Sequence, residues 1–123
     1  IIHPMDVLEA ADFPKLDIIA GNPPYLTAEE MRELQAEVRH EPEMALYGIT
    51  EDGLYFYREI TRLWKRFLKS GGMLAYEVGD AQAEDVAGIL AEHGFTQIRR
   101  IPDLAGNLRV VTGIFSEEAI LNN

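Results

Sequence analysis

Short runs of apolar residues alternate along the chain with longer stretches in which apolar positions recur every three or four residues. The short runs, rich in Val, Ile and Leu, predict strands at residues 16–20, 73–78, 95–101 and 108–115. The longer stretches predict helices at residues 27–39, 53–69 and 83–93. Alternating strands and helices indicate an α/β fold with a mostly parallel sheet, and the short loop between the last two strands favours an antiparallel hairpin.

The strongest helical signal lies at residues 53–69. Its apolar stripe consists of Leu54, Tyr57, Ile60, Leu63, Trp64, Phe67 and Leu68. Lys65, Arg66 and Lys69 place positive charge near the expected carboxyl end, and Gly71-Gly72 is expected to end the helix. The run at residues 16–20 is short, apolar and followed by Gly21, which predicts a buried strand that ends in a loop.

The main candidate for chemistry is Asn22-Pro23-Pro24-Tyr25, directly after that strand. Open α/β sheets bind their ligands at the carboxyl ends of the strands. An amide or exocyclic amine nitrogen is a poor nucleophile, because its lone pair is delocalised. The Asn22 side-chain oxygen and the Pro23 carbonyl can each accept one N–H, which would hold such a nitrogen toward an electrophilic methyl group.

The rest of the motif suits this role. Two prolines stiffen the loop, so that the two acceptors are positioned in advance. Tyr25 offers a flat face against which a planar amide or base can pack. The alternative is a plain turn, since Asn-Pro and Pro-Pro are common in loops.

The chain resembles the HemK-type release-factor glutamine methyltransferases, a branch of the class I S-adenosylmethionine-dependent fold. The resemblance begins with residues 17–26, which look like the family's substrate-amide motif, and it continues through five further segments. These are residues 37–46, Asp52-Gly53-Leu54 with Tyr57-Arg58, Gly71-Gly72, Glu77-Val78-Gly79 with Gln82, and Asp103-Leu104-Ala105-Gly106 with Arg109-Val110-Val111 and Gly113.

This resemblance implies a cytoplasmic enzyme that uses S-adenosylmethionine to methylate the side-chain amide of a glutamine in peptide chain release factors. Residues 1–123 would be the second half of a doubly wound, Rossmann-like sheet, the C-terminal part of the catalytic domain. The family's Gly-rich cofactor loop and helical N-terminal domain would lie upstream. Asn22, Pro23, Pro24 and Tyr25 would bind substrate, with Asn22 and Pro23 catalytic. Asn22 would also border the cofactor, and Asp6 would contact the cofactor adenine, unless Asp6 is only a solvated turn residue.

Composition narrows the choice of partner. The absence of Cys excludes disulfides and thiolate metal sites, and the widely spaced His3, His40 and His93 give no metal-ligand pattern. With 21 acidic and 11 basic residues, the net charge of −10 disfavours nucleic acid as a direct substrate. No apolar window reaches the roughly 18–20 residues of a membrane span.

Several polar residues are expected to have structural roles. Glu77 lies in an apolar run and is expected to be buried, with hydrogen bonds from loop backbone. Gln82 is expected to support the loop after that strand. Arg109 is expected to pair with Asp103 across the last hairpin loop.

Three other functions stay open. One is methylation of a glutamine in a ribosomal protein, and another is methylation of the adenine amino group in DNA, which uses similar acceptor chemistry. The third is a non-catalytic protein-binding fragment. In a fragment, the strand at residues 16–20 would expose an unpaired edge, through which the chain is expected to self-associate.

Overall fold

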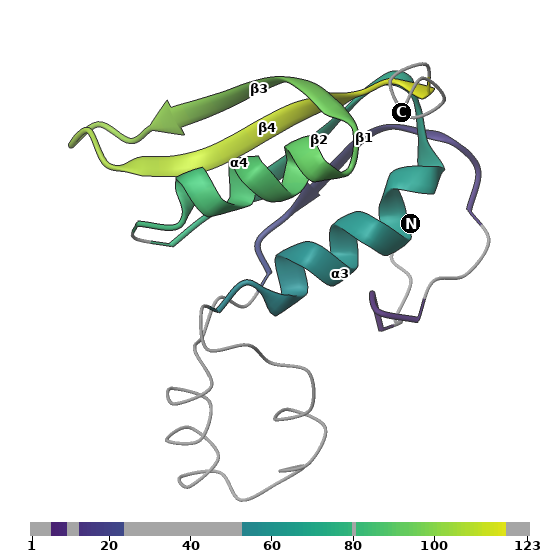
Figure 1. Ribbon diagram of the computed structural model, residues 1–123, viewed down its shortest axis with the longest axis horizontal. Helices are drawn as coiled ribbons and strands as arrows, with labels where there is room; N and C mark the ends of the chain where they lie inside the picture. Colours follow the sequence, from purple (N-terminus) through teal and green to yellow (C-terminus); the bar gives the residue numbers. More distant parts are fainter. Residues whose placement is uncertain (1–5, 10–12, 24–52, 80, 118–123) are drawn as a thin grey trace, which may run out of the picture.

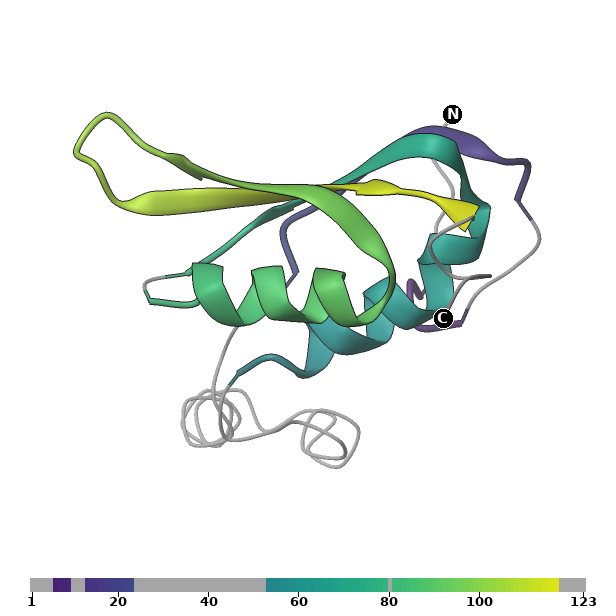
Figure 2. The ribbon, with the colours of Figure 1, turned by 45° about the horizontal axis from the view of Figure 1, so that its top comes forward.

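The computed structural model describes residues 6–9, 13–23, 53–79 and 81–117. The expected helix at residues 27–39 lies outside these segments, as do Pro24 and Tyr25. The described part is an α/β layer structure, in which a four-stranded sheet is covered on one face by two helices (Figures 1 and 2).

The sheet has the order β1-β2-β4-β3. Its strands are β1 (Leu16–Gly21), β2 (Leu68–Glu77), β3 (Phe95–Pro102) and β4 (Leu108–Phe115). β1 and β2 pair in parallel, whereas β4 is antiparallel to both of its neighbours, β2 and β3. β1, β2 and β3 therefore run in the same direction, and β4 is inserted between β2 and β3 against them. The expected α/β class and the antiparallel final hairpin are confirmed.

The helices are α3 (Tyr55–Trp64) and α4 (Ala83–Glu92), with a 3₁₀ turn η1 (Lys65–Phe67) directly after α3. They bury the core against one face of the sheet (Figure 2). Tyr57 of α3, Tyr76 of β2 and Leu90 of α4 are at most 1% exposed. Val111 of β4 is fully buried among them, so the core reaches from the helices into the centre of the sheet.

The predicted helix at residues 53–69 is longer than α3. It takes in the two residues before α3, the 3₁₀ turn η1 and the first two residues of β2. α3 stops at Trp64, and β2 already begins at Leu68. Phe67 and Leu68 are buried, as their apolar character predicts, but they reach the core from η1 and β2. Gly71-Gly72 does not end a helix. The pair lies inside β2, where the ladder with β1 jumps from Leu68 to Met73, and Gly71 takes a φ of 87°.

β1 is the edge strand of the sheet within the described part of the chain, and its predicted burial is wrong there. No residue of β1 is buried, and Ile18 is 63% exposed. The reason is position: β1 pairs with β2 on one side, and no other described strand pairs with it. Its open side presents backbone N–H and C=O groups in a row.

Candidate functional site

Asn22 and Pro23 follow β1 directly, at the carboxyl end of the parallel pair β1–β2. The last β1 residue, Gly21, pairs with Tyr76 of β2. A Cβ atom on Gly21 would lie 3.7 Å from the Tyr76 ring and 3.8 Å from Pro23, so the tyrosine ring covers the strand end. Asn22 is exposed and Pro23 is buried. The motif is therefore anchored by its proline and offers its amide side chain to solvent.

A cavity of about 470 Å³ opens beside Asn22. Such a volume is in the range of small-molecule sites, roughly 300–1,000 Å³. It brings together Asp6, Asn22 and Pro23, three of the residues selected from the sequence. The other lining residues are Val7, Leu8, Ile19, Ala20, Gly21, Phe56, Ile60, Trp64 and Tyr76. Pro24 and Tyr25 of the motif lie outside the described segments.

The floor of this cavity is one face of α3. Phe56, Ile60 and Trp64 line it at intervals of four residues, which places them above one another on the helix. The apolar stripe predicted from the sequence included Ile60 and Trp64 but not Phe56. The four-residue spacing of these three large apolar side chains was the signal that could have marked a second apolar face.

A neighbouring face of α3 fixes the helix to the sheet. The Tyr57 hydroxyl donates to the Glu77 carbonyl at 2.9 Å, and the Thr61 and Tyr76 hydroxyls form a hydrogen bond at 2.7 Å. The Tyr57 and Tyr76 rings meet edge to face, with centroids 5.3 Å apart. These contacts hold α3 beside the strand ends. Thr61 was not singled out from the sequence, although a polar residue inside an apolar helical stripe is a signal for such a contact.

Tyr76 is a neutral phenol in this site. Burial raises the pKa of its hydroxyl well above the ordinary value, and the hydrogen bond with Thr61 offsets only part of that rise. At neutral pH the Tyr76 side chain therefore shapes the cavity and carries no charge. A role as a general base is unsuited to it, because the deprotonated form is disfavoured.

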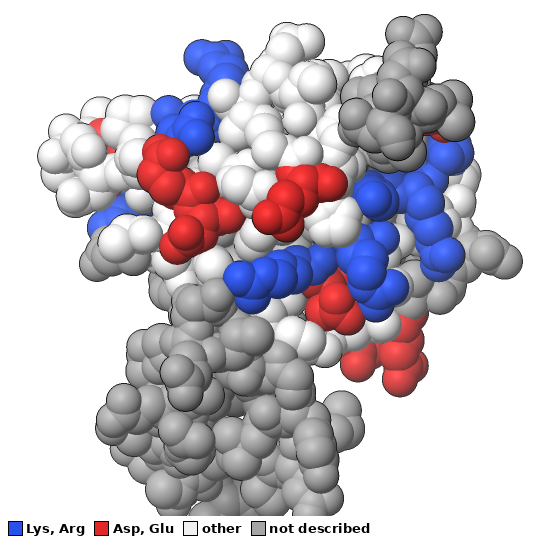
Figure 3. Space-filling model, in the orientation of Figure 1, with Lys and Arg blue, Asp and Glu red and all other residues white. Residues whose placement is uncertain are grey.

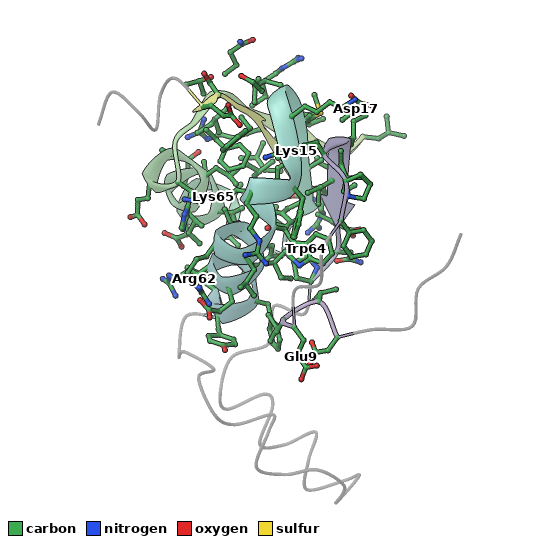
Figure 4. The ribbon with its side chains drawn as sticks, turned by 90° about the vertical axis from the view of Figure 1, so that its right-hand side faces the viewer. Glu9, Lys15, Asp17, Arg62, Trp64 and Lys65 are labelled. Carbon is green, nitrogen blue, oxygen red and sulfur yellow. The ribbon has the colours of Figure 1, made fainter. Side chains whose placement is uncertain are left out.

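The turn at Asp6 also lines the cavity. The Asp6 Oδ1 atom accepts a hydrogen bond from the Leu8 N–H at 2.9 Å, and the Asp6 carbonyl accepts one from Glu9 N–H at 3.0 Å. The Trp64 indole N–H donates to the Val7 carbonyl at 2.7 Å, which ties this turn to α3. Figure 4 shows Trp64 between α3 and the turn that carries Glu9. Asp6 is thus both a turn residue and a cavity residue.

Three structural roles were expected for polar residues, and two of them are confirmed. The Gly79 N–H donates to the Gln82 Oε1 atom at 3.2 Å, so Gln82 closes the loop after β2 as expected. Arg109 and Asp103 form an ion pair at 3.2 Å across the last hairpin, also as expected. The prediction for Glu77 is wrong: its side chain is exposed, because Tyr76 and Val78 occupy the core positions on either side of it.

The charge of the chain is unevenly distributed. All Lys and Arg residues except Arg32 and Arg39 lie in the described segments, whereas the acidic cluster Glu29, Glu30, Glu33 and Glu37 lies outside them. Figure 3 shows Lys and Arg gathered over α3 and the turn that follows it. The argument from net charge against nucleic acid therefore does not extend to this face, and that expectation stays a prediction.

The described segments contain no group of three or more His, Asp or Glu side chains arranged to hold a metal ion. They also contain no helix that is long and apolar enough to cross a membrane.

Known proteins resemble this chain over most of its length. It is 45% identical over 101 residues to a release factor glutamine methyltransferase of Clostridium acetobutylicum, which covers 81% of this chain and 35% of the relative. It is 43% identical over 98 residues to a release factor glutamine methyltransferase of Fusobacterium nucleatum, and this match covers 79% of the chain and 27% of the relative. A bifunctional methyltransferase of Rickettsia felis is 40% identical over 98 residues, and this match covers 79% of the chain and 18% of the relative. No family model matches the chain.

A solved structure is also similar. It is a release-factor-specific protein-(glutamine-N5) methyltransferase from Alicyclobacillus acidocaldarius, 27% identical, with a TM-score of 0.44. The match covers 75% of this chain and 61% of that structure.

By sequence, the chain is related to methyltransferases. Among these, the relatives it matches at 45% and 43% identity are release factor glutamine methyltransferases, so the expected resemblance to that family is confirmed. The chain spans only part of the length of these curated relatives: 35% of the first, 27% of the second and 18% of the third.

Proposed function

We propose that the complete protein transfers a methyl group from S-adenosylmethionine to the side-chain amide nitrogen of a glutamine in a peptide chain release factor. The observation that carries this proposal is the position of Asn22-Pro23. In a chain 45% identical to a release factor glutamine methyltransferase, these residues border a cavity at the carboxyl end of a parallel strand. That is where α/β enzymes bind their ligands.

Catalysis would rest on positioning. The Asn22 side-chain oxygen accepts one amide N–H of the substrate glutamine, and the Pro23 carbonyl accepts the other. Both N–H bonds are then held in one plane, and the nitrogen lone pair faces the incoming methyl carbon. S-adenosylmethionine would supply that methyl group on a sulfonium centre: as the N–C bond forms, the S–C bond breaks to leave a neutral thioether, and the amide nitrogen releases one of its protons to solvent. Pro23 is buried against the strand end, which fixes its carbonyl before substrate arrives. Pro24 and Tyr25 complete this substrate site in the proposal.

The described cavity fits the cofactor in character. Phe56 and Trp64 provide flat apolar surfaces, and the exposed Asp6 carboxylate at the rim can accept hydrogen bonds from an amino group. Asn22 borders the same cavity, between this cofactor wall and the substrate. We assign Asp6, Phe56 and Trp64 to cofactor binding.

The chain would supply only one part of the catalytic domain. Its match to between 18% and 35% of the length of the relatives named above supports the view that residues 1–123 are one portion of a longer protein, and we assign this portion to the C-terminal part of the catalytic domain. A Gly-rich cofactor loop and a helical N-terminal domain would then come from upstream sequence. The experiments below therefore use the complete protein.

The central test is Asn22→Ala in the complete protein. Loss of a positioned hydrogen-bond acceptor is expected to lower kcat by roughly a hundredfold or more. Cofactor affinity, measured by calorimetry, should stay within a few-fold. Glu77→Ala is the matched control, because Glu77 lies at the same edge of the sheet, is exposed, and does not line the cavity. Near-normal turnover of the Asn22→Ala variant would refute the assignment.

The substrate is tested with tritiated S-adenosylmethionine. Purified release factor, a ribosomal protein with an exposed glutamine, and duplex DNA are offered separately. Label is expected in release factor, at the glutamine amide. Label that enters only the ribosomal protein or only DNA would replace the proposed substrate. A complete protein that binds release factor without labelling it would favour a non-catalytic binding role.

A further inference from the structure

The Asp103 side chain makes three of the hydrogen bonds that hold the loop between β3 and β4. The Asp103 Oδ1 atom accepts hydrogen bonds from the Ala105 N–H at 2.9 Å and the Asn107 N–H at 3.0 Å. Its Oδ2 atom accepts one from the Arg109 Nε–H at 3.2 Å. These hydrogen bonds lower the pKa of the Asp103 carboxyl group, so the loop is stabilised by a charged acceptor at neutral pH.

Backbone contacts complete this loop. The Asp103 N–H donates to the Asn107 carbonyl at 2.8 Å, and the Gly106 N–H donates to the Asp103 carbonyl at 3.1 Å. Gly106 takes a φ of 89°, which a residue with a side chain rarely adopts. The loop from Asp103 to Asn107 therefore has one well-defined shape.

This ordered loop presents a fully exposed leucine. The exposed fraction of Leu104 is 109%, the highest among the exposed large apolar side chains of the described segments. A single exposed apolar residue is common on protein surfaces and needs no explanation by itself. Here, however, the side chain sits on a loop that five hydrogen bonds hold in place. A partner that buries Leu104 would lose little conformational entropy in ordering the loop.

The loop lies at the end of the sheet where β1, β2 and β3 have their carboxyl ends, which is also the end that carries the candidate site. β3 runs in the same direction as β1, so their last residues, Pro102 and Gly21, lie at the same end of the sheet. Figures 1 and 2 show the hairpin projecting beyond α4 at that end. Three strand spacings separate β1 from β3, or about 14 Å. A standard protein interface of about 800 Å² per partner is roughly 30 Å across and would span both features.

A second cavity lies at the base of the hairpin. Its volume is about 440 Å³, and it opens between the first residues of α4 and the loop. Ala83, Glu84, Asn107 and Arg109 are among its lining residues. This end of the sheet thus combines the exposed Leu104 side chain with the cavity beside it, whose lining includes charged and polar residues. This relief is suited to a folded protein partner with its own apolar pocket, because Leu104 can enter that pocket while polar groups meet around it.

We propose that the loop from Asp103 to Asn107 is a docking element for the protein substrate, with Leu104 inserted into an apolar pocket of the release factor. This rests on the proposed function, since it names the substrate's second point of contact. The glutamine reaches Asn22 and Pro23, while Leu104 contacts the body of the substrate beyond the end of β3, three strand positions away from β1. The loop would add affinity for the intact protein and nothing to the chemical step.

The test compares Leu104→Ser with Leu104→Met in the complete protein. Each variant is assayed with intact release factor and with a short peptide that carries the target glutamine. Leu104→Ser is expected to raise KM for release factor by about tenfold or more, the usual effect of losing a well-buried apolar contact. Its kcat, its melting temperature and its kinetics with the peptide should stay unchanged. Leu104→Met, which keeps an apolar side chain of similar size, should resemble the parent.

Two results would overturn the docking role. One is a KM for release factor within twofold of the parent in Leu104→Ser, and the other is an equal loss with peptide and protein. Binding of release factor to both variants, measured by calorimetry, separates this proposal from the proposed function. A parent that methylates neither substrate would refute the function. Even then, weaker binding by Leu104→Ser alone would support docking, and equal binding by all three proteins would exclude it.

Discussion

The hydrogen bond between Thr61 and Tyr76 makes a quantitative prediction about stability. The two residues are 0% and 1% exposed, and their hydroxyl oxygens are 2.7 Å apart. Thr61→Val keeps the shape of the side chain and leaves the Tyr76 hydroxyl without this partner. An unsatisfied buried hydroxyl costs about 1–3 kcal/mol. Tyr76→Phe should cost less, about 1 kcal/mol, because a helical threonine can turn its hydroxyl to a backbone carbonyl in the preceding turn.

The double variant is expected to be more stable than the sum of the single losses. With both hydroxyls removed, no buried polar group is left without a partner, and two apolar groups of similar shape remain in contact. The coupling free energy should be about 1 kcal/mol or more. Equilibrium urea unfolding of the four proteins, analysed with a common slope, measures it.

A control cycle pairs Tyr76→Phe with Thr96→Val. Thr96 is exposed and lies on β3, which is separated from β2 by β4, so the two changes should be additive. If the Thr61 and Tyr76 changes were additive as well, the hydrogen bond between α3 and β2 would not contribute to stability. The account of how α3 is fixed beside the cavity would then be wrong.

Two further predictions concern the glycines and the sheet edge. Gly72→Ala should destabilise the protein by roughly 1–3 kcal/mol, because the new Cβ would lie 2.9 Å and 3.0 Å from the backbone oxygens of Lys69 and Asp17. Gly88→Ala is its control: the helical position has no atom within 4 Å of a Cβ, and urea unfolding should show a gain of about 0.5–1 kcal/mol. The 123-residue chain by itself should self-associate through β1, which light scattering at rising concentration measures. A monomer that binds S-adenosylmethionine at micromolar concentration would contradict that expectation.

Strands were predicted well where local pattern and environment agree. The bounds of β4 at Leu108–Phe115 match the prediction, because an apolar run between a loop and a polar segment leaves little choice. α3 shows the limit of this reasoning. Its periodic stripe continues through Phe67 and Leu68, since both reach the same core, but a sequence pattern does not reveal that the backbone changes from helix to strand between them.

The candidate site was predicted in part. Asp6 and Asn22 are far from Phe56 and Trp64 in sequence, and only the fold brings them to one cavity. The motif at Asn22 could be recognised because its chemistry is local. The spacing of Phe56, Ile60 and Trp64 could have marked a second apolar face, but not its use, because a large apolar residue on a helix is equally suited to a core and to a ligand site. Glu77 illustrates the same limit, since its exposure depends on which face of β2 the helices cover.

The insertion of β4 between β2 and β3 has a consequence for how the molecule is made. β4 follows β3 along the chain, yet it lies inside the sheet. A growing polypeptide that has reached Pro102 therefore has two strands running the same way with an empty position between them. Neither ladder flanking that position can begin to form until residues from Leu108 onward have emerged from the ribosome, and both are complete only with Phe115. Most of the sheet pairing thus forms in one late step, and a product truncated before Leu108 would keep β3 unpaired and exposed to aggregation.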